Sequence, residues 1–356
     1  MSEDLTYYLK KAVGINGYLS LNEFFAIVLY HKTKGYYSRN NIIGKKGDFV
    51  TAPEISQTFG EIIATWIVLN LRILNINKNF SFSELGPGKG TLMTDIITTI
   101  KKVDSKLFKK VKKIFFLEKS NQFKSLLKKK FFNAIILEDI GDLPKNFNIV
   151  IANEFFDALP LNQYIKKKNS WFERVVSLDK NNNFCFRTAR APTISSRFFP
   201  QDVDDGYVFE YSEYFFSITN MLFNNIKKNG GIVLIIDYSK KSHDINGTLF
   251  SIKNHRHKNP FVGLGFSDIS FKPDFEIIKK IAEINDCSII GQVTQSFFLQ
   301  RLGINERFDV LINENPRKKI SLLKQKERLI SKKQMGQSFD VLAISDKKIK
   351  VRYGFE

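Results

Sequence analysis

A glycine-rich segment between two apolar stretches constrains this chain more than any other feature. Residues 80–85 are apolar enough for a buried strand, and residues 91–101 carry apolar side chains at the 3.6-residue spacing of a helix. Three glycines lie between them at Gly86, Gly88 and Gly90. Glycine lets a ligand approach the backbone where a Cβ atom would collide. The segment therefore predicts a strand, a ligand-binding turn and a helix.

Spacing separates this turn from two common nucleotide-binding loops. The dinucleotide fingerprint G-x-G-x-x-G, begun at Gly86, would end on Thr91 instead of glycine. The phosphate-binding loop G-x-x-x-x-G-K-[ST] would need glycine at Ser83 and Ser or Thr at Gly90. The pattern that fits is E-x-G-x-G-x-G, typical of the S-adenosylmethionine (SAM) loop of class I methyltransferases. We expect the cofactor to contact this loop at Glu84, Gly86, Pro87, Gly88 and Gly90.

A second acid supports this interpretation. Glu118 ends the next predicted strand, residues 111–118. A carboxylate at that strand end can accept hydrogen bonds from both ribose hydroxyls. The alternative is an ordinary loop carboxylate. Because the two features follow neighbouring strands, we expect Glu118 to bind the cofactor.

The order of predicted elements indicates an α/β fold. Strands at 80–85, 111–118, 134–137 and 148–152 alternate with helices, a pattern that favours a Rossmann-like parallel sheet covered on both faces. Residues 163–189 resemble a strand meander instead, which predicts a β-rich insertion at about 161–210. We expect a methyltransferase domain at 79–356, a helical N-terminal subdomain at 1–78 with one long helix over 54–76, and irregular structure over 243–271.

Composition limits partners and compartment. The chain has 55 Lys and Arg against 36 Asp and Glu, a net charge of +19, which favours acidic partners such as nucleic acid. A general bias toward Lys, Ile, Asn and Phe explains the same number without a functional role. Residues 1–11 lack the pattern of a targeting signal, and Asn70 and Arg72 interrupt the most apolar stretch, residues 62–76. We expect a cytoplasmic bacterial protein with no transmembrane segment and, since no acid or cysteine accompanies His255 and His257, no metal site.

Several strings along the chain resemble one family. The most specific are GDFVTAPEISQ at 47–57, ELGPGKGTLM at 84–93 and NEFFDALP at 153–160; GYY at 35–37, FGE at 59–61, IIDY at 235–238 and MG at 335–336 follow the same order. They resemble the MidA-like SAM-dependent methyltransferases, a family of mitochondrial complex I assembly proteins and bacterial relatives. The resemblance implies a class I fold and methylation of a protein arginine, on a quinone-site subunit of respiratory complex I. Gly247 replaces an acid of the family pattern and residues 270–273 differ from it, whereas Asp268 matches.

With arginine as the implied acceptor, the acids after the fourth strand become candidate catalytic residues. Glu154 and Asp157 are three positions apart, so a helical turn would place them on one face. A carboxylate can hold a guanidinium in a bidentate grip and receive the released proton. Asn153 completes the candidate set, Phe155 and Phe156 are expected to stack on the guanidinium, and Glu210 and Asp237 are weaker candidates for a second carboxylate. The alternative is that these polar residues only stabilise the turn.

The string at 47–57 has a separate expected role. We expect this loop to cover the cofactor and exclude water, with Asp48 and Thr51 contacting it. A structural turn before a helix is the alternative. Two other functions stay open: a nucleic-acid methyltransferase, which the charge favours but Glu154 and Asp157 oppose, and a non-catalytic assembly factor that keeps SAM binding.

Overall fold

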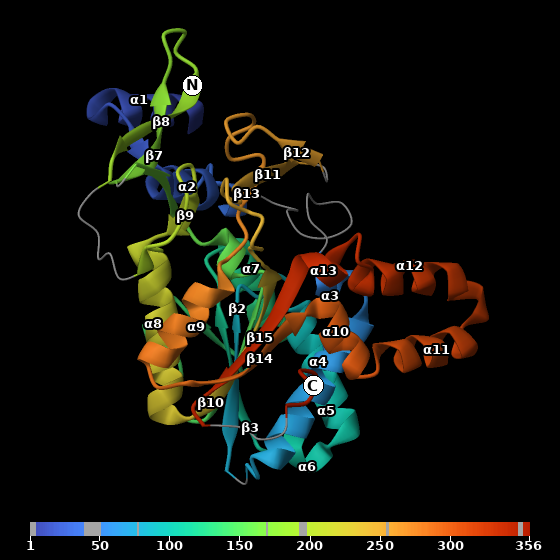
Figure 1. Cartoon of the computed structure of the whole chain (residues 1–356). Helices are drawn as coiled ribbons and strands as arrows, with labels where there is room; N and C mark the ends of the chain where they lie inside the picture. Colours follow the sequence, from blue (N-terminus) through green and yellow to red (C-terminus); the bar gives the residue numbers. More distant parts are fainter. Residues whose placement is uncertain are drawn as a thin grey trace.

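A seven-stranded sheet forms the centre of the molecule (Figure 1). The computed structural model describes residues 5–38, 51–76, 78–168, 170–191, 198–253, 256–347 and 352–356. Its central strands follow the order β14-β15-β10-β5-β2-β3-β4; β10, β5, β2, β3 and β4 are parallel, and β15 is antiparallel to both neighbours. The strands are β2 (Phe80–Leu85), β3 (Val111–Leu117), β4 (Ile135–Leu137), β5 (Asn148–Asn153), β10 (Gly231–Tyr238), β14 (Ser288–Thr294) and β15 (Phe339–Ser345).

Helices cover both faces of this sheet, as the sequence predicted. Strand β5 shows the reason: Ile149 and Ile151 enter one hydrophobic cluster and Val150 and Ala152 enter the other, because successive side chains point to opposite faces. One face carries α8 (Glu213–Asn229) and α9 (Phe275–Ile284). The other carries α4 (Gln57–Ile73), α5 (Thr91–Val103), α7 (Asn121–Lys130), α10 (Gln295–Arg301) and α11 (Ile304–Glu314). Three further helices are α6 (Ser105–Phe108), α12 (Lys319–Ile330) and α13 (Met335–Ser338).

The prediction of one long helix over 54–76 is wrong in one respect, because the structure has two helices there. A short helix α3 (Ala52–Ile55) ends before Ser56, whose backbone is extended at φ −157°, and α4 begins at Gln57. The Ser56 hydroxyl accepts a hydrogen bond from the N–H of Thr58, which caps the start of α4. The break lets α3 turn toward the glycine loop while α4 packs along α5.

The expected insertion contains a second sheet. Strands β6 (Asn162–Lys167), β7 (Ser170–Leu178), β8 (Phe184–Arg190) and β9 (Val208–Tyr211) are joined by the short N-terminal β1 (Leu19–Ser20), which pairs antiparallel with β7. Helices α1 (Leu5–Asn16) and α2 (Leu21–Tyr30) pack against this sheet. The structure thus distributes the expected N-terminal subdomain over two places, residues 5–38 at the second sheet and α4 at the central one. The boundary at residue 78 stays a prediction.

The expectation of irregular structure over 243–271 is only partly correct. A small antiparallel sheet forms there in the order β12-β11-β13, from Phe250–Lys253 (β11), Arg256–Lys258 (β12) and Asp268–Ser270 (β13). Strands of three or four residues are too short to show a period in the sequence. Of the helices in the described ranges, none has the length and apolar character needed to cross a membrane.

Candidate active site

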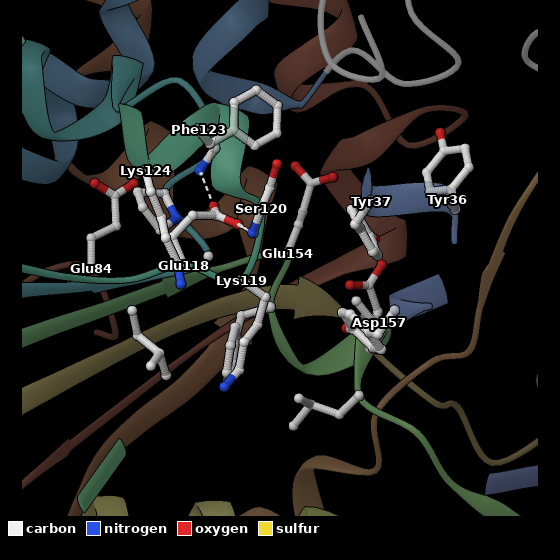
Figure 2. A pocket seen from close by; sticks show the side chains of 18 of the residues that line it. Tyr36, Tyr37, Glu84, Glu118, Lys119, Ser120, Phe123, Lys124, Glu154 and Asp157 are labelled. Atoms are coloured by element: carbon white, nitrogen blue, oxygen red, sulfur yellow. Dashed lines mark hydrogen bonds between the residues drawn. The ribbon is translucent and has the colours of Figure 1, made fainter. Parts of the chain in front are cut away.

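A cavity of about 1090 Å³ opens at the carboxyl ends of β2, β3 and β5 (Figure 2). This edge is where open α/β sheets bind ligands. The glycine loop and Glu118 line one end of it, and the segment after β5 lines the other. Helix α2 and a 3-10 turn at Tyr36–Ser38 add their side chains from the N-terminal region.

The glycine loop has a backbone that only glycine adopts easily. Gly86, Gly88 and Gly90 have φ values of +66°, +53° and +67°. A Cβ atom on Gly90 would lie 2.7 Å from the side chain of Leu127, and one on Gly86 would lie 3.3 Å from Phe155, which itself lines the cavity. The glycines therefore keep the floor of the cavity open and let α5 begin close to α7.

Glu118 is held against this loop. Its Oε2 accepts a hydrogen bond from the N–H of Gly88 at 3.2 Å, and its Oε1 accepts one from the N–H of Ser120 at 2.8 Å. Burial raises the pKa of the Glu118 carboxyl, and these backbone bonds oppose the shift. The structure thus brings together the two sequence features that predicted a cofactor site, although their contact with the cofactor stays a prediction.

Glu84 also borders the cavity but is a buried strand residue, 3% exposed. Among the described residues its Oε2 has no hydrogen-bond partner. Burial raises the pKa of Glu84 to about 8, so the carboxyl is mostly protonated at neutral pH. It lies close enough to Glu118 for the two carboxyls to interact electrostatically.

The sequence analysis missed a third strand end. Glu138, Asp139 and Ile140 follow β4 and line the same end of the cavity as Glu118. The Asp139 carboxylate accepts a hydrogen bond from the N–H of Gly141 at 2.8 Å, which fixes the turn. The sequence could have indicated these residues, because they directly follow the predicted strand 134–137, which comes next in the chain after the strand that ends at Glu118.

The expected covering loop lies only partly within the described residues. Asp48 and residues 47–50 lie outside the described residues, and Thr51, Pro53 and Glu54 line the cavity. Glu54 accepts a hydrogen bond on Oε1 from the Thr91 hydroxyl at 2.5 Å, and its Oε2 lies 3.4 Å from Lys89 Nζ. The roles of Asp48 and Thr51 stay predictions.

Acids cluster at the other end of the cavity. Glu154 has a left-handed backbone, φ +52°, which is unusual for a non-glycine residue and frequent at functional sites. Its Oε1 accepts hydrogen bonds from the N–H of Ala52 and from the Asn153 amide, both at 3.3 Å. Burial raises the pKa of Glu154 to about 7. Asp157 follows on a 3-10 turn, Phe156–Ala158, and its side chain lines the cavity with those of Glu154 and Asn153.

The two weaker carboxylate candidates, Asp237 and Glu210, both hold neighbouring segments of the fold by hydrogen bonds. Asp237 is fully buried under the turn, where it accepts hydrogen bonds from the N–H groups of Phe156 and Asp157 at 2.9 and 3.3 Å. Burial and the neighbouring Asp237 raise the pKa of Asp157 well above its usual range. Glu210 does not line the cavity; it accepts hydrogen bonds from the backbone N–H and the hydroxyl of Thr248 at 2.8 and 2.7 Å.

The predicted aromatic wall is half correct. Phe155 lines the cavity, whereas Phe156 is buried in the core and packs edge-on against Phe215. The aromatic groups that the sequence analysis missed come from the N-terminal region. Tyr30 and Tyr37 stack at 5.4 Å, and the Tyr30 hydroxyl donates to the carbonyl of Ala158 at 2.7 Å.

One further acid joins this end of the cavity. Asp268, at the start of β13, is 5% exposed and lines the cavity, close enough to Tyr37 for its charge to act on that side chain. Its charge contributes to raising the pKa values of Tyr37 and Asp157. The match of Asp268 to the family pattern was the signal that could have placed it. The described residues contain no group of three or more metal-ligand side chains arranged to hold an ion, and His255 lies outside them.

Strand order, glycine loop and cavity together define the class I methyltransferase fold. Residues 62–293 match a family model described as "Putative S-adenosyl-L-methionine-dependent methyltransferase", and the chain belongs to that family. The cofactor of this enzyme family is SAM. The residues present fit it, because the positive-φ glycines leave a cradle that a Cβ atom would partly fill and Glu118 lies beside them.

Curated relatives extend over nearly the whole chain. Protein arginine methyltransferase NDUFAF7, mitochondrial, of Danio rerio is 26% identical over 97% of this chain and 87% of its own length. The proteins of the same name from Mus musculus and Homo sapiens are 28% and 27% identical over 97% of this chain and 84% and 83% of their own lengths. A Burkholderia thailandensis protein crystallised with S-adenosyl-homocysteine shares the fold, with a TM-score of 0.83, 24% identity, and 98% of this chain and 93% of that one covered.

Proposed function

We propose that this methyltransferase transfers the methyl group of SAM to an arginine side chain of a protein substrate. The single observation that carries the proposal is the end of the cavity away from the glycine loop, where three acids, Glu154, Asp157 and Asp268, meet the stacked rings of Tyr30 and Tyr37. Acids and aromatic faces together suit a planar cation. The relatives named protein arginine methyltransferase support the same acceptor.

Methyl transfer to arginine needs a base, because the guanidinium loses a proton in the reaction. Bound SAM supplies a methyl group on a sulfonium, which favours in-line displacement by a nitrogen. A guanidinium is a poor nucleophile because its pKa is above about 12. Glu154 can hold it, localise its charge away from the attacking nitrogen, and accept the proton released when the new C–N bond forms. Its pKa of about 7 leaves Glu154 substantially ionised at neutral pH, whereas burial and the neighbouring Asp237 raise the pKa of Asp157 well above its usual range.

A nucleic-acid acceptor is disfavoured by the same residues. Phosphates brought to this end of the cavity would meet Glu154 and two buried acids, so the net charge of +19 would act only at the outer surface. A non-catalytic assembly factor that keeps SAM binding remains the second candidate. The resemblance stated above supports a complex I quinone-site subunit as target, and we propose a location in the bacterial cytoplasm, which cell fractionation tests.

The decisive experiment compares protein arginine methylation by mass spectrometry in cells with and without this protein, followed by transfer from labelled SAM to the candidate target with purified enzyme. Loss of one methylarginine in the deletion strain and its formation in vitro support the proposal. Label on nucleic acid would show the wrong acceptor. Tight binding of S-adenosyl-homocysteine with no transfer to protein or nucleic acid would identify the non-catalytic alternative.

A further inference from the structure

The four-residue helix α3 lies between the two ends of the cavity. At one end, the Thr91 hydroxyl donates to Glu54 Oε1 at 2.5 Å, directly after the glycine loop. At the other end, the N–H of Ala52 donates to Glu154 Oε1 at 3.3 Å. One short element is therefore hydrogen-bonded both to the first residue of α5, directly after the cofactor loop, and to the candidate base.

The connection between these contacts is short and stiff. Ala52 and Glu54 are separated only by Pro53, whose ring fixes φ. The N–H groups of Glu54 and Ile55 both donate to the carbonyl of Thr51, at 2.9 and 3.2 Å, which closes the turn. A shift of Glu54 relative to the start of α5 must then move Ala52 relative to Glu154.

From this geometry we infer that Glu54 is a positioning residue, which ties the glycine loop to Glu154 through α3. The inference concerns the orientation of Glu154. It rests on the proposed function only in that Glu154 is taken as the base of the methyl transfer. A purely structural role would be that Glu54 stabilises the start of α5 and has no influence on Glu154.

The ionisation of Glu154 distinguishes these two roles. The Ala52 N–H favours the charged form and lowers the pKa of Glu154, against the larger effect of burial. Loss of this bond must raise the pKa further. Five other charged or titratable groups interact electrostatically with Glu154: Asp157, Asp237, Tyr238, Asp268 and Arg328. The charged groups near Glu54 are Lys89, Asp95 and Lys130.

The test follows the Glu154 carboxyl directly. The whole 356-residue chain, labelled with 13C at glutamate carboxyls and saturated with S-adenosyl-homocysteine, is titrated by NMR, and the Glu154 resonance is assigned by its absence in Glu154→Gln. We expect Glu54→Ala and Thr91→Val to raise the midpoint by about one pH unit, a tenfold change in the ionisation constant. Glu54→Gln and Thr91→Ser keep the hydrogen bond between the two side chains and should keep the midpoint.

The matched control is Glu61→Gln on α4. Glu61 accepts a hydrogen bond from Arg307 at 2.7 Å, and its side chain is 15% exposed against 17% for Glu54, but it does not line the cavity. In Glu61→Gln, the midpoint of the Glu154 titration should equal that of the wild type. An unchanged midpoint in both folded Glu54→Ala and Thr91→Val would overturn the inference, and so would an equal shift in the control. The titration uses no methyl acceptor, so its result tests the role of Glu54 even if this protein does not methylate arginine.

Discussion

The N–H of Gly88 donates to the carboxylate of Glu118, so the glycine loop and the acid of the next strand are joined before any ligand binds. Each of these groups follows a parallel strand, and the pairing of β2 with β3 brings them to the same edge. The contact leaves Glu118 oriented along the cavity that both groups line. Its carboxylate is thereby preorganised for hydroxyl donors.

Replacing Glu118 with Ala should weaken cofactor binding. Charged hydrogen bonds to ribose hydroxyls contribute roughly 1.5–3 kcal/mol each, so we expect the Kd for S-adenosyl-homocysteine to rise about tenfold or more. Isothermal titration calorimetry measures this change. Glu283→Gln, on the exposed side of α9, serves as the control and should bind as the wild type. Unchanged affinity in folded Glu118→Ala would remove Glu118 from the cofactor site.

The substitution Gly86→Val tests the loop itself. The backbone at Gly86 has φ +66°, and a Cβ atom would lie 3.3 Å from Phe155, so a branched side chain is both strained and directed into the cavity wall. We expect binding of S-adenosyl-homocysteine to fall below detection in a chain that keeps its helical circular dichroism. The control Gly14→Val adds the same side chain where nothing lies within 4 Å, and it should bind normally. Normal binding by Gly86→Val would contradict the assignment of this loop.

Much of this site could be predicted because its parts depend on local sequence. The glycines and the acid at the end of β3 have fixed offsets from apolar strands, and parallel strands place their carboxyl ends together. Glu154 and Asp157 could be placed at the cavity for the same reason, and their catalytic role stays a prediction. Asp237 was misinterpreted because its role depends on the register of β10 beside β5, which places it under the 3-10 turn instead of in the cavity.

Other parts depended on contacts between distant segments. Tyr30 and Tyr37 reach the cavity because β1 pairs with β7 of the second sheet, and two residues of strand leave no periodic signal. Asp268 reaches it on a strand of three residues, in a region expected to be irregular. The break at Ser56 was hidden because Ile55, Phe59 and Ile62 keep the spacing of one continuous helix, although serine is a common first residue before a helix.

Glu84 gives a prediction about stability and pH. Its pKa is about 8 in the folded chain and near 4.5 when exposed, so between these values the folded state binds more protons than the unfolded state. The contribution of Glu84 to the free energy of unfolding must therefore fall as pH rises, by at most about 1.4 kcal/mol per unit. Urea denaturation from pH 5.5 to 7.5 should show a steeper decline for the wild type than for Glu84→Gln. Parallel curves would show that Glu84 is ionised in the fold.

Asp268 gives a prediction about the acceptor. It lines the cavity, and its charge acts on Asp157 and Tyr37, so Asp268→Asn should raise the KM for an arginine peptide by about tenfold and leave the Kd for S-adenosyl-homocysteine unchanged. Steady-state kinetics and calorimetry measure the two quantities. Asp274→Asn, at the start of α9 and outside the cavity, is the control. A rise in both constants would place Asp268 with the cofactor instead.

Glu154 gives the prediction on which the mechanism depends. Glu154→Gln keeps the shape of the side chain and the bond from Ala52 but cannot accept a proton, so kcat should fall by about 10²- to 10⁴-fold while cofactor affinity stays near the wild-type value. Because the pKa of Glu154 is about 7 and the ionised form is the active one, wild-type kcat should rise with pH up to about that value and then level off. The residual activity of Glu154→Gln should lack this rise. Transfer assays with labelled SAM between pH 6 and 8.5, with Glu61→Gln as the matched control, measure both effects. A Glu154→Gln enzyme with the wild-type rate, or with the same pH dependence, would show that another group receives the proton.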